Sequence, residues 1–485
     1  MSDGPDEIPP QARRSGVDFL RLARAWLQGG WRAARSVEPE FWKNLQHELL
    51  TGRQWFDRVV VLACAVATGL LVVGFTLLAE AAFDLYRQLS QWGGFGRYLA
   101  LLWTPLLTVA VLWWTRRYVP GAAGSGIPQV MVALDDSLHP QQRSFLVSLK
   151  LSFHKIALVS AGLLGGLSIG REGPAVQVGA GMMAHARRWL SPQSTIDAHD
   201  LMVAGAAAGI AAAFNTPLGG VVFALEKLSG RRGISHSSLV IAAIVLSGLI
   251  SVAAFGKETY FGELRVQEMS WALLGPGLTV ALIAGLAGGL FARLIVVSTR
   301  GLPDRVSHWR RSYPYRFAAA CGFGVALIAW ATGGATAGAG YMPTRALLEG
   351  HAELPGVYTV LKFCASWLST WSGVPAGVFA PALAIGAGIG NDVALFFGLG
   401  KEAAIPLIAL GMAGFLSAAT GGPITAFIIV MEMVSGHAMV LSLMACSLLS
   451  SGVSRLLTKP LYQELAATLV VPPAPLPPAE MRADR

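Results

Sequence analysis

Long apolar runs constrain the fold of this chain more than any other feature of its sequence. The runs Val59 to Ala79, Leu239 to Phe255 and Leu273 to Ala292 approach or reach the roughly 20 residues that a helix needs to cross a bilayer. Only 13% of the residues are charged, about half the share usual in soluble proteins. A large soluble α/β enzyme, the alternative, would need more charge to cover its surface. The sequence therefore predicts an all-α, polytopic membrane protein, because an open sheet edge cannot lie in lipid.

The chain divides into three expected regions. Across residues 58–469 apolar segments alternate with short polar breaks, which predicts one helical membrane domain. Residues 1–57 mix Arg, Asp and Glu without the apolar core of a signal peptide, which predicts a cytoplasmic segment. Its stretch from Val17 to Ala34 has the pattern of an amphipathic helix, at the membrane face or in the cytosol. Residues 470–485 are Pro-rich and predict a disordered tail without room for a regulatory domain.

Positive charge gathers in or beside the polar breaks, within a net charge of +9. The basic pairs are Arg116–Arg117, Arg187–Arg188, Arg231–Arg232 and Arg310–Arg311. Such clusters are typical of cytoplasmic loops, so we predict an integral protein of the inner or plasma membrane with both termini cytoplasmic. No basic patch is interleaved with aromatic residues, which argues against a nucleic-acid partner.

The four cysteines lie far apart and mostly in apolar segments. No two of them have the spacing of a metal or redox site. We therefore expect small buried hydrophobic residues, and neither a metal nor a cofactor.

An internal repeat relates two halves of the chain. The segment Gly205 to Gly230 matches Gly411 to Gly436 at a constant offset of 206 positions. The identical pairs are Gly205/Gly411, Ala212/Ala418, Ala213/Ala419, Pro217/Pro423, Glu226/Glu432, Ser229/Ser435 and Gly230/Gly436. Upstream, GREGP (170–174) meets GVFAP (377–381) at an offset of 207, which also pairs Lys155 with Lys362. Two related halves are typical of transporters, whose binding sites lie where the repeats meet.

Three Gly/Pro-rich breaks interrupt the apolar runs: GSGIP (124–128), GREGP (170–174) and GVPAGVFAP (373–381). Irregular backbone at membrane depth survives only where it is buried in protein or lines a wet cavity. We expect each break to end one helix and start another near mid-membrane. Helix N-termini carry free N–H groups and partial positive charge, so their convergence would bind an anion without a fixed cation. The alternative is that the glycines only permit close helix packing.

The order of these elements carries a family resemblance. GSGIP, then GREGP, then GxFxP, then the late tyrosine Tyr462 in KPLY resembles the chloride channel and transporter (CLC) family, over residues 48–469. The resemblance implies the prokaryotic form of the fold, with two inverted-repeat halves of tilted and broken helices. It also implies a homodimer in membrane lipid, with one anion pathway in each subunit.

The resemblance further implies a set of site residues. The hydroxyls of Ser125 and Tyr462 and the amides of Val378 and Phe379 would bind a central anion, because such donors replace water without trapping the ion. Serine at position 125 is similar to members that prefer chloride, whereas proline would indicate nitrate. The backbone of the anion pathway would comprise Gly124, Gly126, Ile127, Pro128, Gly170, Arg171, Gly173, Pro174 and Gly377.

Glu172 is the expected gating and proton-exchanging residue. A charged carboxylate inside a membrane domain costs roughly 2.5–3.5 kcal/mol. Burial favours the neutral acid and nearby helix N-termini favour the carboxylate, a balance that suits a group gaining and losing a proton. The carboxylate would occupy an anion site and swing out when protonated, as the family resemblance implies. The alternative is a salt bridge with Arg171.

Lys227 departs from the family pattern. In proton-coupled relatives a second glutamate passes protons from the cytoplasmic side, and that position falls on Lys227, with Glu226 aligning to the preceding acid. Lysine cannot relay protons as a carboxylate does, so it either snorkels to the surface or adds positive charge near the inner anion entrance. Gln129 also replaces an acid that often follows GSGIP, without an evident meaning.

Other charged residues of the repeat leave alternatives open. Glu226 and Glu432 lie at the ends of apolar runs, where we expect structural roles ahead of functional ones. Lys155 and Lys362 lie inside apolar runs and either steer anions or pair with carbonyls.

The leading functional prediction is chloride/proton antiport. A passive chloride channel of the same fold is the alternative, because of Lys227. An enzyme is the rival of another class: GLSIG (166–170) matches GxSxG around Ser168, and GAGIG (386–390) resembles a nucleotide loop. No strand precedes either motif and no catalytic partner can be assigned, so we predict a protein that is not an enzyme.

Overall fold

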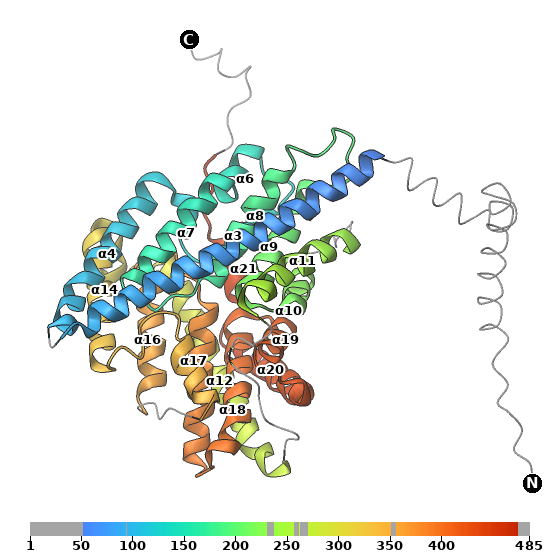
Figure 1. Ribbon diagram of the computed structural model, residues 1–485. Coiled ribbons are helices and arrows are strands. Elements are labelled where there is room, and N and C mark those ends of the chain that lie inside the picture. Colours follow the sequence, from blue (N-terminus) through green and yellow to red (C-terminus); the bar gives the residue numbers. More distant parts are fainter. Residues whose placement is uncertain are drawn as a thin grey trace, which may run out of the picture. The chain divides into compact units, whose positions relative to one another are not determined.

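The computed structural model describes residues 52–93, 95–229, 237–256, 261, 270–350 and 356–473. The expectations for residues 1–51, for the pair Arg231–Arg232 and for the tail beyond residue 473 therefore lie outside the described residues. Within the described ranges every regular element is helical, apart from one isolated antiparallel bridge between Gly170 and Gly377 (Figure 1). This confirms the predicted all-α class.

The first half of the chain supplies α3 (Gly52–Gln91), α4 (Gly96–Tyr118), α5 (Ile127–Ala133), α6 (Pro140–Leu146), α7 (Leu149–Leu164), α8 (Glu172–Ala186), α9 (Ala198–Phe214), α10 (Pro217–Phe223) and α11 (Ser237–Phe255). The second half supplies α12 (Leu274–Arg300), α13 (Arg305–Ser312), α14 (Pro314–Ala331), α15 (Tyr341–Leu348), α16 (Tyr358–Trp371), α17 (Phe379–Phe396), α18 (Lys401–Thr420), α19 (Pro423–Met433), α20 (Val440–Arg455) and α21 (Leu461–Ala467). Short 3-10 turns lie at Pro120–Ala122, Trp271–Leu273 and His437–Met439, and a π-helical turn at Ala224–Leu228 extends α10.

The chain divides into two units, residues 1–59 with 190–194, and residues 60–189 with 195–485. In the first unit the Asp57 carboxylate accepts hydrogen bonds from the backbone N–H of Ser191 at 2.9 Å and from its hydroxyl at 2.8 Å. The second unit contains the repeat and all three Gly/Pro-rich breaks.

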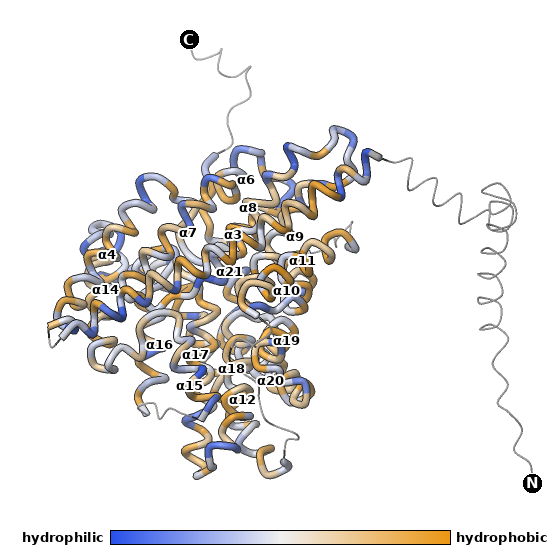
Figure 2. The backbone as a smooth tube through the Cα atoms, viewed as in Figure 1, coloured by the Kyte–Doolittle hydropathy of each residue, from blue (hydrophilic) through white to orange (hydrophobic). Residues whose placement is uncertain are grey.

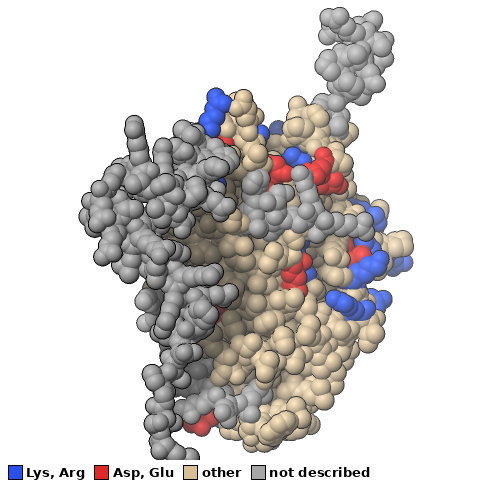
Figure 3. All heavy atoms as spheres, turned by 90° about the vertical axis from the view of Figure 1, so that its right-hand side faces the viewer, with Lys and Arg blue, Asp and Glu red and all other residues tan. Residues whose placement is uncertain are grey.

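Nine helices in the described ranges are long and apolar enough to cross a membrane. The three apolar runs named from the sequence lie in α3, in α11 and in α12 with the turn before it, as predicted. Figure 2 shows hydrophobic residues along the helices and hydrophilic residues mostly at their ends and in the loops. On the face in Figure 3, a wide lower area carries almost no charged side chain.

Helix α12 has one exposed apolar side and one side packed against other helices. A stripe of leucines at every fourth position is exposed: Leu274, Leu278, Leu282, Leu286 and Leu290. A large apolar stripe of this kind suits contact with lipid chains. On the buried side, a Cβ at Gly285 would lie 2.8 Å from Cβ of Val453 in α20, and one at Gly288 would lie 2.6 Å from Cβ of Ala418 in α18. Small residues therefore bring three helices into close contact, as is common in membrane proteins.

The two halves repeat the same helix contacts. Helices α8 and α9 pack through Gly179 and Gly205, where a Cβ on either glycine would collide with the carbonyl oxygen of the other. Helices α17 and α18 pack in the same way through Gly386 and Gly411. These two pairs are related by the offsets of 207 and 206 found in the sequence. The predicted repeat is therefore also a repeat of three-dimensional packing.

Candidate functional site

Three helices begin inside the Gly/Pro-rich breaks, as predicted: α5 at Ile127, α8 at Glu172 and α17 at Phe379. The first backbone N–H groups of a helix have no acceptor within the helix and carry partial positive charge. Helices α8 and α17 therefore each present such groups at the breaks that precede them.

The three breaks are joined by backbone hydrogen bonds. The N–H of Gly170 donates to the carbonyl of Gly377 at 2.7 Å, and the N–H of Gly377 donates back at 3.1 Å. The N–H of Ala376 donates to the carbonyl of Gly124 at 3.1 Å, which links the first and third breaks. Segments more than 200 residues apart in the sequence therefore meet at one place.

Two glycines are required by this convergence. Gly126 has φ +107°, a conformation that side chains rarely adopt, and a Cβ there would lie 2.9 Å from the carbonyl oxygen of Gly173. A Cβ at Gly173 would in turn collide with Oγ of Ser125. The glycines hold the first break against the N-terminal turn of α8, which is the close packing considered as one of their two roles.

Ser125 and Tyr462 meet at this place with unpaired hydroxyls. Helix α21 contacts α5, and Ser125 neighbours the Tyr462 side chain. The Tyr462 ring stacks on Phe379 with centroids 6.0 Å apart and an interplanar angle of 10°. Both residues are buried, yet neither Oγ of Ser125 nor Oη of Tyr462 has a hydrogen-bond partner among the described residues. Buried hydroxyls without partners are costly, so two together indicate a place for an acceptor such as an anion.

Glu172 lies at the first turn of α8 and is fully buried. A Cβ built on Gly170 would lie close to both Oε2 of Glu172 and Cβ of Ala380, which places the carboxylate beside the first turn of α17. Its Oε2 atom still has no hydrogen-bond partner, whereas Oε1 accepts one from the hydroxyl of Tyr341. A carboxylate thus occupies the space in front of the N-terminal amides of α8 and α17, where a free anion would also be stabilised.

Arg171 pairs with Glu80 of α3, with 2.8 Å between Nη2 and Oε1. Its guanidinium also lies over the ring of Tyr341, 5.2 Å from the centroid. The guanidinium of Arg171 is therefore shared between Glu80 and Tyr341 at the edge of the site.

Tyr341 was not expected from the sequence. It begins α15 and contacts Glu172 across 169 positions of the chain. A possible signal was the run Gly338–Ala339–Gly340 before it, which has the same glycine spacing as Gly124–Ser125–Gly126.

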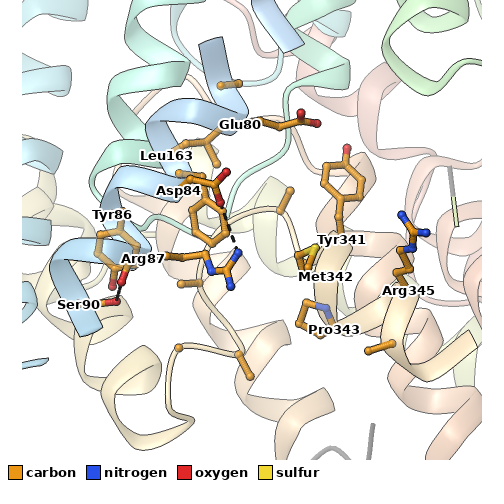
Figure 4. Close-up of a pocket in the computed structure, with 18 of the residues that line it drawn as sticks. Glu80, Asp84, Tyr86, Arg87, Ser90, Leu163, Tyr341, Met342, Pro343 and Arg345 are labelled. Carbon is orange, nitrogen blue, oxygen red and sulfur yellow. Dashed lines mark hydrogen bonds and ion pairs between the residues drawn. The ribbon is translucent and has the colours of Figure 1, made fainter. Parts of the chain in front are cut away.

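A cavity of about 760 Å³ lies beside this contact (Figure 4). Its polar lining includes Glu80, Asp84, Arg87, Arg171 and Tyr341. Arg87 and Asp84, one turn apart on α3, form an ion pair at 3.4 Å in the cavity lining. Glu172 does not line the cavity, but Arg171 and Tyr341 both do. Both residues therefore border the cavity and also neighbour Glu172, Arg171 along the chain and Tyr341 through its hydrogen bond.

Gln129 has a structural role that explains its amide. Its Oε1 accepts a hydrogen bond from the N–H of Gly126 at 3.0 Å, and its Nε2 donates to the carbonyl of Ala123. An ionised acid at this position could only accept. The amide therefore holds both sides of the turn that carries Ser125.

The two buried lysines pair with carbonyls. Lys155 donates from Nζ to the carbonyls of Ala122 and Gly124, both at 2.7 Å. Lys362 donates to the carbonyls of Thr336 at 3.0 Å and Gly338 at 2.7 Å. Carbonyl pairing, one of the two alternatives left open by the sequence, is thus observed for both, and each lysine anchors a glycine-rich turn.

The repeat-related glutamates cap each other's helices. Glu226 accepts hydrogen bonds from the N–H of Ile424 at 3.1 Å and from the N–H and hydroxyl of Thr425 at 2.8 and 2.6 Å, at the start of α19. Glu432 accepts from the N–H of Leu218 at 3.1 Å and of Gly219 at 2.6 Å, at the start of α10. Carboxylates are stabilising at helix N-termini. These contacts support the expected structural roles.

Lys227 reaches the end of α18, where its Nζ donates to the carbonyl of Thr420 at 3.3 Å. Glu226 and Arg455 are its charged neighbours. A cation near the C-terminus of a helix is favourable. The side chain therefore belongs to the α18–α19 connection, which adds a third role to the two considered from the sequence.

Ser168 of the GLSIG motif and a group of acidic and histidine side chains at the start of α9 both make structural hydrogen bonds. The hydroxyl of Ser168 lies 2.9 Å from that of Ser366, and its N–H donates to the Ser369 hydroxyl. One described group, Asp197 with His199 and Asp200, places its side-chain ligand atoms within 4.8 Å of one another. Oδ1 of Asp197 accepts a hydrogen bond from the N–H of Asp200 at 2.8 Å, which is the geometry of a helix cap on α9.

Sequence comparison relates the chain to known proteins. Residues 106–455 match the model of the family described as voltage gated chloride channel. The chain belongs to this family. The H(+)/Cl(-) exchange transporter ClcA of Cronobacter sakazakii is 30% identical over 392 residues, covering 76% of this chain and 79% of the relative. The ClcA transporter of Vibrio parahaemolyticus is 27% identical over 467 residues, covering 90% of this chain and 94% of the relative.

Solved structures share the fold. A slow cyanobacterial Cl-/H+ antiporter superposes with a TM-score of 0.71 at 23% identity, over 85% of this chain and 97% of that one. A CLC-type fluoride/proton antiporter superposes with a TM-score of 0.68 at 21% identity, over 84% and 97% of the two chains. The fold predicted from the family resemblance is thereby confirmed. With the apolar helices, family membership identifies an integral membrane protein.

Proposed function

We propose that this protein exchanges chloride for protons across a membrane, with Glu172 as the group that both gates the anion pathway and carries the proton. The observation that carries the proposal is the position of the Glu172 carboxylate, fully buried before the amides of α8 and α17. Relatives covering most of the chain are named H(+)/Cl(-) exchange transporters, which supports the same activity.

Chloride binds next to this carboxylate in the proposal. The unpaired hydroxyls of Ser125 and Tyr462 and the amides of Val378 and Phe379 donate to it. None of these groups is a fixed cation, so the ion is dehydrated without being trapped. The nearby ammonium of Lys155 supports the Ser125 turn through two carbonyls rather than facing the ion as a ligand.

Exchange follows from competition for one place. The ionised carboxylate of Glu172 and a chloride ion are both stabilised by the N-terminal amides of α8 and α17, so each excludes the other. Protonation removes the charge that holds the carboxylate there, which lets the side chain leave and chloride enter. The return of the carboxylate releases the proton and displaces the anion.

The test is a flux assay on purified full-length protein in proteoliposomes under a chloride gradient. We expect chloride movement to drive protons uphill, and Glu172→Ala to retain chloride flux without proton flux. Chloride flux without coupled proton movement in the unmodified protein would refute the antiport proposal and indicate a passive chloride pathway. The absence of chloride flux in both proteins would sink anion transport itself.

A passive chloride channel is the second candidate, and Lys227 is the observation that favours it. At the position of the cytoplasmic relay glutamate stands a lysine whose Nζ binds the carbonyl of Thr420. Protons would then have to pass by water alone. The same assay separates the two candidates.

The assembly and placement of the protein are part of the proposal. We infer a homodimer with one pathway per subunit, lying in the lipid of the inner or plasma membrane with both termini cytoplasmic. The transport domain covers residues 58–469, between an N-terminal segment (1–57) that we place in the cytoplasm and the Pro-rich C-terminal segment (470–485). The protein acts on chloride, similar anions and protons, without a cofactor, a metal, a nucleic acid or an enzymatic reaction.

A further inference from the structure

The turn before α15 is a structural copy of the turn that carries Ser125. Gly124 and Gly126 have φ +71° and +107°, and Gly338 and Gly340 have φ +64° and +94°. The buried lysines Lys155 and Lys362 bind the carbonyls of the two turns in the same pattern. In the first half this turn brings a hydroxyl, that of Ser125, to the α8 N-terminus.

The second turn also brings a hydroxyl to Glu172, but from the next residue. Position 339 is alanine, while the Tyr341 hydroxyl donates to Oε1 of Glu172. The Tyr341 ring is held by the guanidinium of Arg171, 5.2 Å from its centroid, and by the ring of Phe261, with 6.0 Å between centroids. Arg171 is itself fixed by Glu80 at 2.8 Å. The hydroxyl is therefore delivered by a side chain that is packed on two sides.

The tyrosine also borders the cavity of about 760 Å³. Figure 4 shows its ring at the cavity edge, with the hydroxyl turned away from Met342 and Pro343. Glu172 does not line the cavity, so the hydroxyl of Tyr341 joins its carboxylate to a residue of the cavity edge.

We propose that Tyr341 is a positioning residue that latches the Glu172 carboxylate in the anion pathway and releases it on protonation. The inference rests on the proposed function, since it describes how the same glutamate is held. A hydroxyl bonds an ionised carboxylate about twice as strongly as a neutral acid. The latch is therefore strong while Glu172 is charged and weak once it is neutral, so Tyr341 ties departure of the side chain to uptake of a proton.

Loss of the latch has a measurable consequence for chloride binding. Chloride can bind only while the carboxylate is out of the site. The apparent Kd for chloride therefore equals the intrinsic Kd divided by the fraction of protein in which the site is vacant. If Tyr341→Phe weakens the hold on the carboxylate about tenfold, equivalent to ~1.4 kcal/mol, the apparent Kd for chloride falls by up to about tenfold. The phenyl ring keeps its packing against Arg171 and Phe261.

The experiment is a calorimetric titration of the purified full-length protein with sodium chloride near neutral pH. It compares the unmodified protein, Tyr341→Phe, Glu172→Ala and the double variant. Tyr86→Phe is the matched control, because Tyr86 lines the same cavity but its hydroxyl neighbours Thr104. We expect tighter chloride binding in Tyr341→Phe, no effect of the same change in the Glu172→Ala background, and no effect of Tyr86→Phe.

Three results would overturn the latch. Unchanged binding in Tyr341→Phe would mean that the contact does not hold the carboxylate. Weaker binding in the double variant than in Glu172→Ala would make Tyr341 a direct ligand of chloride. A Tyr341→Phe protein that no longer elutes as a single species would make the residue structural.

A flux measurement separates this inference from the function on which it rests. In proteoliposomes, Tyr341→Phe is expected to carry more chloride per proton than the unmodified protein, because the carboxylate leaves without first being protonated. Coupling that is present and equal in both proteins would refute the latch alone. Coupling that is absent from the unmodified protein would refute the antiport proposal.

Discussion

The reciprocal caps formed by Glu226 and Glu432 make a quantitative test of how the two halves are joined. Glu226 accepts three hydrogen bonds at the start of α19, and Glu432 accepts two at the start of α10. Helices α10 and α19 contact each other, and Figure 1 shows them side by side. Removal of either carboxylate should therefore weaken the contact between repeats without touching the anion site.

The expected losses follow from the number of bonds. A hydrogen bond to a charged group contributes about 1.5 kcal/mol at the lower end of its range, so Glu432→Ala should cost about 3 kcal/mol and Glu226→Ala about 4.5 kcal/mol. The difference of about 1.5 kcal/mol arises from the hydroxyl of Thr425, at 2.6 Å from Oε2 of Glu226. The variant Thr425→Val should therefore lower the free energy of unfolding by this difference alone. It should cause little further loss in the Glu226→Ala background.

The assay is equilibrium unfolding in mixed detergent micelles, with the transport rate per folded protein measured in parallel. We expect the unfolding midpoint to fall in the order Glu432→Ala, then Glu226→Ala, while chloride affinity stays unchanged. Losses within about 0.5 kcal/mol of the unmodified protein, the usual range for inconsequential surface changes, would refute the capping role. A loss of chloride binding by the folded variants would place the glutamates in the pathway instead.

Further predictions concern the anion site, the helix packing and the relay position. Ser125→Ala and Tyr462→Phe should each weaken chloride binding by about tenfold in calorimetry, for the loss of one hydrogen bond to an ion at the lower end of its range, ~1.5 kcal/mol, and unchanged affinity in both would contradict the proposed site. Gly411→Ala should destabilise the protein by about 1–3 kcal/mol in detergent unfolding, because its Cβ collides with the α17 backbone. Gly452→Ala, in open space on α20, should be neutral or stabilising, and equal losses in both variants would argue against close packing as the cause. Lys227→Met should leave proton movement per chloride within about twofold, an order-of-magnitude bound of roughly 0.4 kcal/mol, and a larger change would give the lysine a direct role.

The fold was largely predictable because its constraints are local or periodic. Apolar runs of about 20 residues can only be helices in lipid, and α3, α11 and α12 lie where the runs indicated. The helix starts at Glu172 and Phe379 followed from glycine and proline, which are poor in helix interiors.

The site was predictable only in part, because several of its contacts depend on distant residues. The sequence placed Ser125 and Tyr462 together through the family resemblance, and their hydroxyls are indeed neighbours. It gave no meaning to Gln129, whose two hydrogen bonds depend on a turn with positive φ at Gly126. The carbonyl partner of Lys227 lies 193 positions away, so no local pattern could identify it.

Tyr341 could not be found from the repeat because the offset between the two halves changes near it. The turns related by the repeat lie 214 positions apart (Gly124 and Gly338), whereas the lysines that bind them lie 207 apart (Lys155 and Lys362). The seven extra positions in the first half, 214 − 207, break the constant offset just where the second turn would have been aligned. The hydroxyl residue also differs in position between the two turns. In the first half it is Ser125, before α5, whereas in the second half it is Tyr341, the first residue of α15.

Because of this difference, the two repeat-related turns present hydroxyl groups with different partners. The first turn leaves the Ser125 hydroxyl unpaired, available to an anion, while the second commits the Tyr341 hydroxyl to the carboxylate of Glu172. A fully symmetric pair would offer two equivalent anion sites and no means of holding a gate. An unpaired hydroxyl on one side and an occupied one on the other let the same backbone bind a mobile ion and retain a covalently attached competitor. Substitutions in the two turns should therefore shift chloride affinity in opposite directions, with weaker binding in Ser125→Ala and tighter binding in Tyr341→Phe.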